Sequence, residues 1–205
     1  MIQLVLATHN QHKVLELTEL LASHPISVVS VSVWPELVPP DETGATFAEN
    51  AFIKASTVAK HTGCYALADD SGIMIDALDG QPGIHSARWA GPDSGADEWI
   101  AKSLALLKGV PPHLRTCRYV CALSLVDPTG CLCFATTGIM EGRIGTEVLG
   151  TNGFGYDPIF MCFPNFTLSA AQLTSEEKHL ISHRGQALAS LMEELTLRGL
   201  QQPCV

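Results

Sequence analysis

The sequence predicts an α/β protein, and three observations support this fold class. Residues 2–7 are almost all apolar, which is typical of a strand buried on both faces. After a polar turn, apolar side chains recur at helical spacing from Val14 to Leu21. Farther along, residues 116–126 and 131–137 flank the turn sequence Asp-Pro-Thr-Gly, which predicts a long antiparallel hairpin. A chain of 205 residues is expected to form one domain or two closely packed lobes.

The remaining segments also predict both strands and helices. Residues 26–33 are the second expected strand, and Thr46-Phe47-Ala48-Glu49 matches a capping box that starts a helix through Ala59. Downstream we expect a helix at 96–107, a strand at 159–163, a capped helix at 174–181, an interruption at 182–185, a last amphipathic helix ending at Gly199, and a frayed tail at 200–205.

The composition limits the partners and the compartment. The formal net charge of −9 disfavours a protein that binds nucleic acid by neutralising phosphates, although a few lysines can still bind a small phosphorylated ligand. No apolar run approaches the ~18 residues of a membrane span, and residues 1–7 do not resemble a signal peptide. Seven cysteines without paired C-x-x-C spacing favour thiols in a reducing cytosol. We therefore expect a cytoplasmic protein that binds neither membranes nor nucleic acid.

The most informative stretch is Ala68-Asp69-Asp70-Ser71-Gly72. Apolar residues on both sides predict a strand that runs into a tight turn formed by Ser71 and Gly72. Side chains alternate along a strand, so Asp69 and Asp70 should point to opposite sides, where one of them can face a metal or a substrate. The alternative is an acidic turn between two strands of a hairpin, without a functional role.

Other segments offer groups that suit a nucleotide. Residues 8–13 open a helix whose N-terminal N–H groups, together with Lys13, suit a phosphate; the alternative is an ordinary helix capped by Asn10. Phe154, between two glycines, can stack on a planar base or anchor its own loop.

Lysines, carboxylates and base-edge donors together indicate a nucleotide polyphosphate with Mg²⁺. Lys54 and Lys178 can bind phosphates as point charges, and His183 and Arg184 can donate to a carbonyl on a base edge. Two pairs of adjacent carboxylates without a His/Cys cluster favour Mg²⁺, which takes oxygen ligands and bridges a protein to phosphates.

Six blocks occur in a fixed order along the chain. They are Ala7-Thr8-His9-Asn10 with Lys13; Glu42-Thr43-Gly44-Ala45-Thr46-Phe47 with Glu49-Asn50-Ala51 and Lys54-Ala55; Ala68-Asp69-Asp70-Ser71-Gly72; Pro82-Gly83-Ile84-His85-Ser86-Ala87-Arg88; Gly153-Phe154-Gly155-Tyr156-Asp157-Pro158; and Glu177-Lys178 with Ser182-His183-Arg184. With these blocks the chain resembles, from about residue 2 to 195, the non-canonical purine nucleoside triphosphate pyrophosphatases (inosine/xanthosine triphosphate pyrophosphatases).

This resemblance implies a fold and a reaction. The fold is α/β, with a long bent mixed β-sheet flanked by helices and two lobes around a central active-site cleft, so residues 1–205 form a single two-lobed domain. The reaction is Mg²⁺-dependent hydrolysis of ITP, dITP and XTP to the monophosphate and pyrophosphate. It removes these nucleotides from the pool and keeps them out of DNA and RNA. Members of the family are typically homodimers.

The resemblance also implies residue roles. Asp70 is the catalytic proton acceptor and a metal ligand, and Asp41 is the second metal ligand, with Glu42 as the alternative. Residues 8–13 are the phosphate-binding turn, supported by Lys54. The expected substrate-binding residues are Thr8, His9, Asn10, Gln11, His12, Lys13, Lys54, Ser71, Phe154, Gly155, Tyr156, Asp157, Lys178, His183 and Arg184, although His9 has no individual role.

Base selection should depend on the 6-position of the purine. Inosine and xanthosine present a carbonyl acceptor to His183 and Arg184, whereas adenine presents a donor that leaves these donors unpaired. Guanine shares the 6-oxo group, and the sequence does not indicate what excludes it. Two other classes stay open, namely a nucleotide-binding regulator without turnover and a pyrophosphatase for modified pyrimidine nucleotides.

Overall fold

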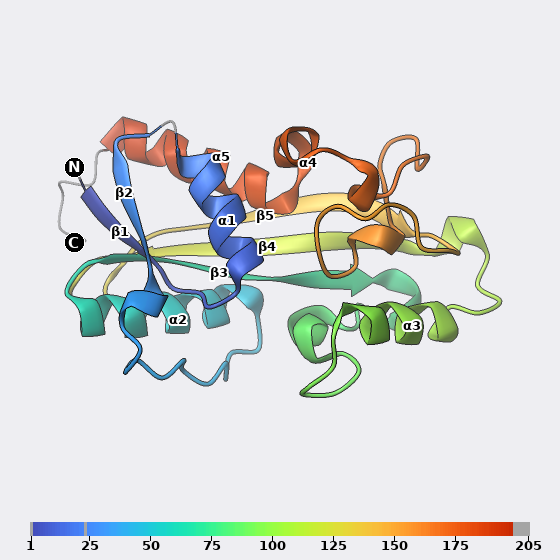
Figure 1. Ribbon diagram of the computed structural model, residues 1–205, viewed down its shortest axis with the longest axis horizontal. Helices are drawn as coiled ribbons and strands as arrows, with labels where there is room; N and C mark the ends of the chain where they lie inside the picture. Colours follow the sequence, from blue (N-terminus) through green and yellow to red (C-terminus); the bar gives the residue numbers. More distant parts are fainter. Residues whose placement is uncertain (1, 23, 199–205) are drawn as a thin grey trace. The chain divides into compact units, whose positions relative to one another are not determined.

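The computed structural model of the protein describes residues 2–22 and 24–198 and has a mixed β-sheet flanked by helices. Six strands occur in the order β2-β1-β3-β4-β5-β6 (Figure 1). β1 is parallel to β2 and β3, whereas β5 and β6 are antiparallel. The strands are β1 (Ile2–Leu6), β2 (Ile26–Ser30), β3 (Tyr65–Ile75), β4 (Thr116–Val126), β5 (Leu132–Ile144) and β6 (Phe160–Cys162). The expected α/β fold class is confirmed.

Side-chain caps define where three of the helices start. Asn10 caps α1, and the capping boxes that begin at Thr46 and Thr174 start α2 and α4, as expected. The α-helices are α1 (Gln11–Leu21), α2 (Phe47–Thr62), α3 (Ala96–Leu106), α4 (Ser175–Ile181) and α5 (His183–Arg198). The expected helix end at Gly199 and the tail at 200–205 lie outside the described residues.

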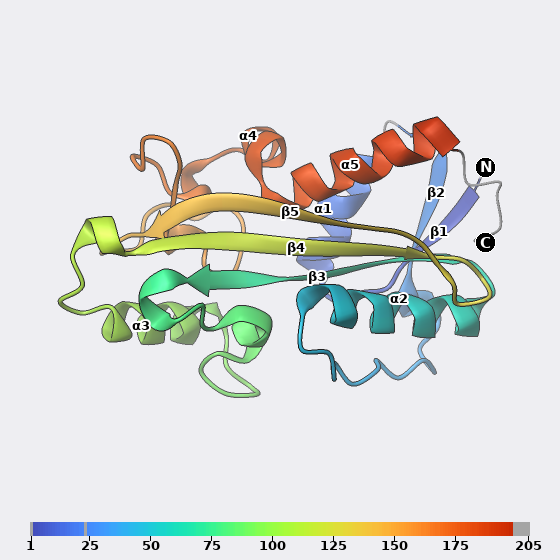
Figure 2. The same ribbon diagram turned by 180° about the vertical axis from the view of Figure 1, so that it is seen from behind.

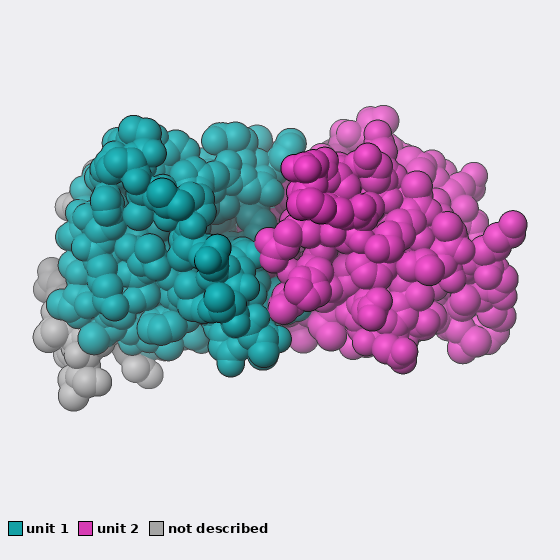
Figure 3. Space-filling view, turned by 90° about the horizontal axis from the view of Figure 1, so that it is seen from below, with its two compact units in different colours: residues 1–70, 121–138, 186–205 teal, residues 71–120, 139–185 magenta. Residues whose placement is uncertain are grey.

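The chain divides into two compact units (Figure 3). Of the described residues, unit 1 contains those up to Asp70, residues 121–138 and those from Gln186 onwards, and unit 2 contains residues 71–120 and 139–185. Strands β3, β4 and β5 therefore contribute residues to both units.

Unit 1 has a hydrophobic core on each face of its part of the sheet. Leu67 of β3 packs in one core with Leu17 of α1 and Leu188 of α5. Ala66 and Ala68, on either side of Leu67 in the sequence, pack in the other core with the alanines of α2. Helices α1 and α5 accordingly cover one face and α2 covers the opposite face (Figures 1 and 2). The alternation along β3 determines the direction of the two aspartates that follow.

Unit 2 has one hydrophobic core. Ile73 and Ile75 of β3, Ile100 of α3, Tyr119 of β4 and Phe160 of β6 all belong to it. The apolar side expected for the helix at 96–107 also packs against this core, with Trp99, Ile100, Leu104 and Leu107.

The structure corrects several element boundaries. The expected turn at Ser71 and Gly72 is wrong: β3 continues to Ile75 because Ile73 and Ile75 are β-formers that are fully buried in the core of unit 2. The second strand ends at Ser30, whose side chain caps a 3₁₀ turn at Val31–Val33. β5 extends to Ile144, seven residues beyond the expected end at 137, and residues Gly83–Arg88 form a 3₁₀ helix where no regular element was expected.

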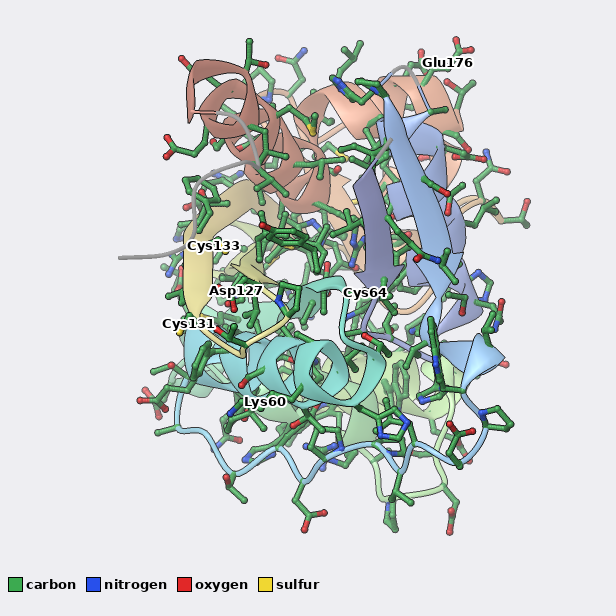
Figure 4. All side chains as sticks on the ribbon, turned by 90° about the vertical axis from the view of Figure 1, so that its left-hand side faces the viewer. Lys60, Cys64, Asp127, Cys131, Cys133 and Glu176 are labelled. Atoms are coloured by element: carbon green, nitrogen blue, oxygen red, sulfur yellow. The ribbon has the colours of Figure 1, made fainter. Side chains whose placement is uncertain are left out.

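The turn between β4 and β5 is held by Asp127. Its Oδ1 accepts hydrogen bonds from the Thr129 amide (2.8 Å), the Thr129 hydroxyl (2.7 Å) and the Cys131 amide (3.0 Å). The Ser56 hydroxyl of α2 donates to the Gly130 carbonyl, and Lys60 of the same helix lies beside this turn (Figure 4). The turn thereby contacts the helix that also contains Lys54.

None of the helices within residues 2–22 and 24–198 combines the length and hydropathy that a membrane-spanning segment needs.

Candidate active site

Adjacent aspartates of β3 pair with lysines from two different helices of unit 1. Lys13, in the first turn of α1, forms an ion pair with Asp69, and Lys54, in the middle of α2, forms an ion pair with Asp70 (Nζ–Oδ1 2.6 Å). Because α1 and α2 cover opposite faces, the two carboxylates point to opposite sides of the strand, as expected.

Asp69 is buried, and protein groups contact both of its carboxylate oxygens. It is 1% exposed, and the Cys121 thiol of β4 donates to its Oδ2 over 3.1 Å while Lys13 contacts its Oδ1. A buried carboxylate with these donors is held in one orientation. Asp69 therefore fixes Lys13 at the start of α1.

Asp70 shares Lys54 with a second carboxylate. The ammonium of Lys54 lies 2.6 Å from Asp70 Oδ1 and 3.1 Å from Glu42 Oε1. Burial raises the pKa of Asp70 and outweighs the opposing effect of Lys54, so this carboxyl takes up a proton more readily than a solvated one. Burial alone would lower the pKa of Lys54, but Asp70 and Glu42 raise it, so the lysine stays charged.

The N-terminal turn is organised by Asn10. Its Oδ1 accepts from the amides of His12 (3.0 Å) and Lys13 (3.3 Å), and its own amide donates to the Thr8 hydroxyl (3.2 Å). The capping role expected as the alternative for Asn10 is thus present. The same cap places Lys13 at the positive end of α1, while His9, Gln11 and His12 are exposed.

The donor set near Asp70 fits a hard divalent cation. No group of three or more His, Cys, Asp or Glu side chains suited to a metal occurs in the part of the chain that the structure describes. Two carboxylates, Asp70 and Glu42, nevertheless contact one ammonium ion. Mg²⁺ is commonly bound through one or two carboxylates and completes its shell with water and phosphate oxygens, so these residues fit it. Asp41, the neighbour of Glu42, is exposed on the same turn.

Asp157 is the centre of a second group of expected site residues, in unit 2. It is 2% exposed, and its Oδ2 accepts from Lys178 Nζ (2.8 Å) and from the Phe154 amide (2.9 Å). Gly153 has φ +72°, and a Cβ at this position would lie 2.1 Å from Asp157 Oδ2. Glycine is required there because both the conformation and the close approach exclude a side chain.

Two cationic side chains, Lys178 and Arg184, lie near the Phe154 ring. Lys178 Nζ lies 5.0 Å and Arg184 Cζ 5.8 Å from the ring centroid. Both cations are almost fully buried, and Phe154 itself is partly exposed. Cation–π attraction at these distances orients the ring.

His183 and Arg184 lie in the first turn of α5, where the sequence predicts an interruption. Arg184 Nη2 donates to the Ser71 hydroxyl over 3.1 Å, which connects α5 to β3 within unit 2. Gly185 permits this arrangement, since a Cβ there would lie 1.9 Å from the His179 carbonyl of α4. α4 and α5 can therefore approach each other closely at the bend that presents these two side chains.

Tyr156 anchors the loop that contains Phe154. Its hydroxyl donates to the Ser86 carbonyl (2.8 Å), and its ring stacks on Trp99 with centroids 5.8 Å apart. The Ser86 hydroxyl in turn accepts from the Ile73 amide (2.9 Å). These bonds hold the Gly83–Arg88 segment against β3.

The structure thus groups the expected residues into two sets, a lysine–carboxylate set in unit 1 and an Asp157-centred set in unit 2. Sequence reasoning missed Cys121 and Tyr119, because both lie in the apolar pattern of β4, which indicates only core. Tyr119 could have been identified by one signal: a phenol in a buried strand needs a hydrogen-bond partner.

Comparisons with known proteins identify the family of this chain. Residues 4–194 match the model of the Ham1 family. The chain is 46% identical over 200 residues to a dITP/XTP pyrophosphatase of Desulforamulus reducens, covering 98% of each chain. It is 47% identical over 199 residues to a dITP/XTP pyrophosphatase of Photobacterium profundum, covering 95% of this chain and 98% of that one.

Solved structures give the same result. A HAM1 protein from Coxiella burnetii superimposes with a TM-score of 0.86 at 41% identity, over 96% of this chain and 100% of the other. The Ham1 protein of Staphylococcus aureus gives a TM-score of 0.83 at 36% identity, over 95% and 98%. The resemblance indicated by the six sequence blocks is confirmed, and the names of the curated relatives agree with the expected enzyme class. The chain therefore belongs to the Ham1 family.

Proposed function

We propose that this chain hydrolyses the non-canonical purine nucleoside triphosphates ITP, dITP and XTP to the monophosphate and pyrophosphate, with Mg²⁺. The observation that supports this most directly is the pairing of Asp69 with Lys13 and of Asp70 with Lys54. Phosphoanhydride hydrolysis needs positive charge near the phosphates and a base for the attacking water. Asp69 and Asp70, which are adjacent in β3, each hold one of the positively charged lysines, and Asp70 is also the proposed base.

The residues of unit 1 bind the triphosphate in this proposal. Lys13 and Lys54 exchange part of their contact with the aspartates for contact with phosphate oxygens, which flexible ammonium side chains can do. The N–H groups at the start of α1 add partial positive charge. These contacts orient the α-phosphate for attack, and pyrophosphate leaves.

Asp70 is the proton acceptor. Its pKa, raised by burial, moves toward the working pH and makes the carboxylate a better base than a solvated aspartate. Mg²⁺, when bound, neutralises phosphate charge and acidifies water. Asp70 and a carboxylate of the 41–42 turn hold this ion: the resemblance favours Asp41, and the contact with Lys54 favours Glu42.

The residues of unit 2 bind the purine. Phe154 stacks on the base, and donors of His183 and Arg184 face the 6-oxo group. Adenine would leave buried donors unpaired at a cost of about 1–3 kcal/mol each. Lys178 and Asp157 hold Phe154 and its loop.

Product analysis tests the proposal. The protein is incubated with Mg²⁺ and, separately, with ITP, dITP, XTP, GTP, ATP and modified pyrimidine triphosphates, and pyrophosphate and orthophosphate are measured. We expect pyrophosphate from the first three and at least ~10-fold slower release from ATP. If no product is released, the chain is better explained as a nucleotide-binding regulator without turnover. If modified pyrimidine triphosphates are hydrolysed fastest, it is better explained as a pyrophosphatase for those nucleotides.

A second experiment identifies the metal ligands. Mn²⁺ binding without nucleotide is measured by electron paramagnetic resonance for Asp41→Asn, Glu42→Gln and Asp70→Asn. We expect weaker binding for Asp70→Asn and for only one of the other two variants.

The cellular role follows from the reaction. We propose that the chain acts in the cytoplasm as a homodimer and removes these nucleotides before polymerases incorporate them into DNA and RNA. Light scattering during size-exclusion chromatography should give twice the mass of the chain.

A further inference from the structure

Tyr119 of β4 lies in the middle of the purine-binding set, although no sequence block includes it. Its hydroxyl donates to Asp157 Oδ1 over 3.1 Å. Its ring stacks with His183 (centroids 4.7 Å apart, planes at 16°) and with Phe160 (4.4 Å, 22°). One side chain therefore contacts two expected substrate-binding residues from segments far apart in the sequence.

The hydroxyl of Tyr119 completes the hydrogen bonding of Asp157. Oδ2 accepts from Lys178 and from the Phe154 amide, so without Tyr119 the carboxylate is held through one oxygen only. The additional donor on Oδ1 fixes the rotation of the carboxylate about its Cβ–Cγ bond. Because Asp157 holds the Phe154 amide, this rotation affects where the Phe154 ring lies.

The ring of Tyr119 has a separate effect on His183. Stacking at 4.7 Å with nearly parallel planes restricts the tilt of the imidazole. His183 starts α5, directly before Arg184. On the Tyr119 side, the stack continues to Phe160, which packs against the Tyr119 ring. The stack therefore connects the base-edge donor to the core of unit 2.

We propose that Tyr119 is a positioning residue for purine selection, which holds Asp157 through its hydroxyl and His183 through its ring. This inference rests on the proposed function. It adds that recognition of the 6-oxo purine depends on a residue that does not touch the base. Burial, together with Asp157, raises the pKa of Tyr119 well above that of a free tyrosine, so the hydroxyl keeps its proton and donates over the working pH range.

Tyr119→Phe separates the two effects, since it removes the hydroxyl and keeps the ring. We expect KM for dITP to rise about 3–10-fold, the range for one lost hydrogen bond, with kcat changed less than about 2-fold. The ratio of kcat/KM for dITP over dATP should fall by a similar factor. Tyr65→Phe, in the unit 1 part of β3, is the control and should leave KM and this ratio unchanged.

A tyrosine that only fills the core gives a different result. Tyr119→Phe would then lower the free energy of unfolding, measured in urea, and leave KM and the selectivity ratio as in the unmodified protein. That result overturns the inference but leaves the proposed function intact. If the unmodified protein releases no pyrophosphate from dITP, the proposed function itself has failed.

A second measurement needs no substitution at Tyr119. The chain has three tyrosines, so 3-fluorotyrosine labelling gives few ¹⁹F resonances, and Tyr65→Phe and Tyr156→Phe assign that of Tyr119 by elimination. Addition of dIMP, the expected product, should shift the Tyr119 resonance, and addition of dAMP should shift it less. Equal shifts, or no shift while dIMP binds, would overturn the inference.

Discussion

Replacement of Asp70 by asparagine should separate activity from stability. The amide keeps the size of the side chain but can neither accept a proton from water nor provide a charged metal ligand. Loss of a positioned base typically slows a reaction ~10²–10⁴-fold, which corresponds to about 3–5 kcal/mol of transition-state stabilisation. We therefore expect kcat for dITP to fall by at least ~10²-fold.

The stability of Asp70→Asn depends on two opposing effects. Burial raises the pKa of Asp70, so the ionised carboxylate is less favourable in the folded protein than in the unfolded chain, and a neutral amide removes this cost. Against this, Lys54 loses a carboxylate at 2.6 Å and keeps Glu42 at 3.1 Å, while the amide oxygen can still accept from it. We expect the free energy of unfolding to change by less than about 1 kcal/mol.

The assays are pyrophosphate release and urea unfolding of the same preparation. Asp127→Asn is the matched control, because this aspartate is also buried in unit 1 but lies in the β4–β5 turn, away from the lysine–carboxylate set. It should lose stability and keep kcat. Asp70→Asn with more than a tenth of the original kcat would refute the role as proton acceptor. A loss of about 3 kcal/mol or more in stability would show that the pair with Lys54 is structural.

Three further predictions concern stability. Lys178→Met should lower the free energy of unfolding by about 3 kcal/mol, because it leaves the buried carboxylate of Asp157 without its ammonium partner. Combining it with Asp157→Asn should recover part of this loss, whereas additive losses in a double-mutant cycle would contradict a direct pair. The hydrogen bond from Thr129, with those from backbone amides, lowers the pKa of Asp127, so its contribution is present above the unfolded pKa of ~3.9 and disappears as pH falls through the folded value. Asp127→Asn should therefore cost roughly 1 kcal/mol at pH 7 and progressively less as the pH falls below ~3.9, and a difference that stays constant over this range would disprove the linkage. Thr46→Ala removes the cap of α2 and should cost ~1 kcal/mol, whereas an unchanged unfolding curve would show that the cap adds nothing.

Local signals in the sequence were sufficient for much of the fold. Asn10, Thr46 and Thr174 cap helices where side-chain chemistry predicts them, because a cap depends on only a few neighbouring residues. The continuation of β3 through Gly72 was not predictable in this way. A glycine after a serine favours a turn locally, but burial of Ile73 and Ile75 in the core of unit 2 outweighs that preference.

The site was predictable as a set of residues but not as a set of contacts. Alternation along β3 correctly separated Asp69 from Asp70, yet nothing in the sequence showed that Lys13 pairs with the first and Lys54 with the second. The bond between Tyr119 and Asp157 joins residues 38 positions apart, and such a pair arises only when β4 and the Phe154 loop have folded together.

The position of the new oxygen in the products tests the proposed chemistry most directly. Hydrolysis of dITP with Mg²⁺ in H₂¹⁸O is followed by mass spectrometry of both products. Attack at the α-phosphate, with Asp70 as proton acceptor, predicts ¹⁸O in dIMP and unlabelled pyrophosphate. Label in pyrophosphate, or release of labelled orthophosphate, would contradict it.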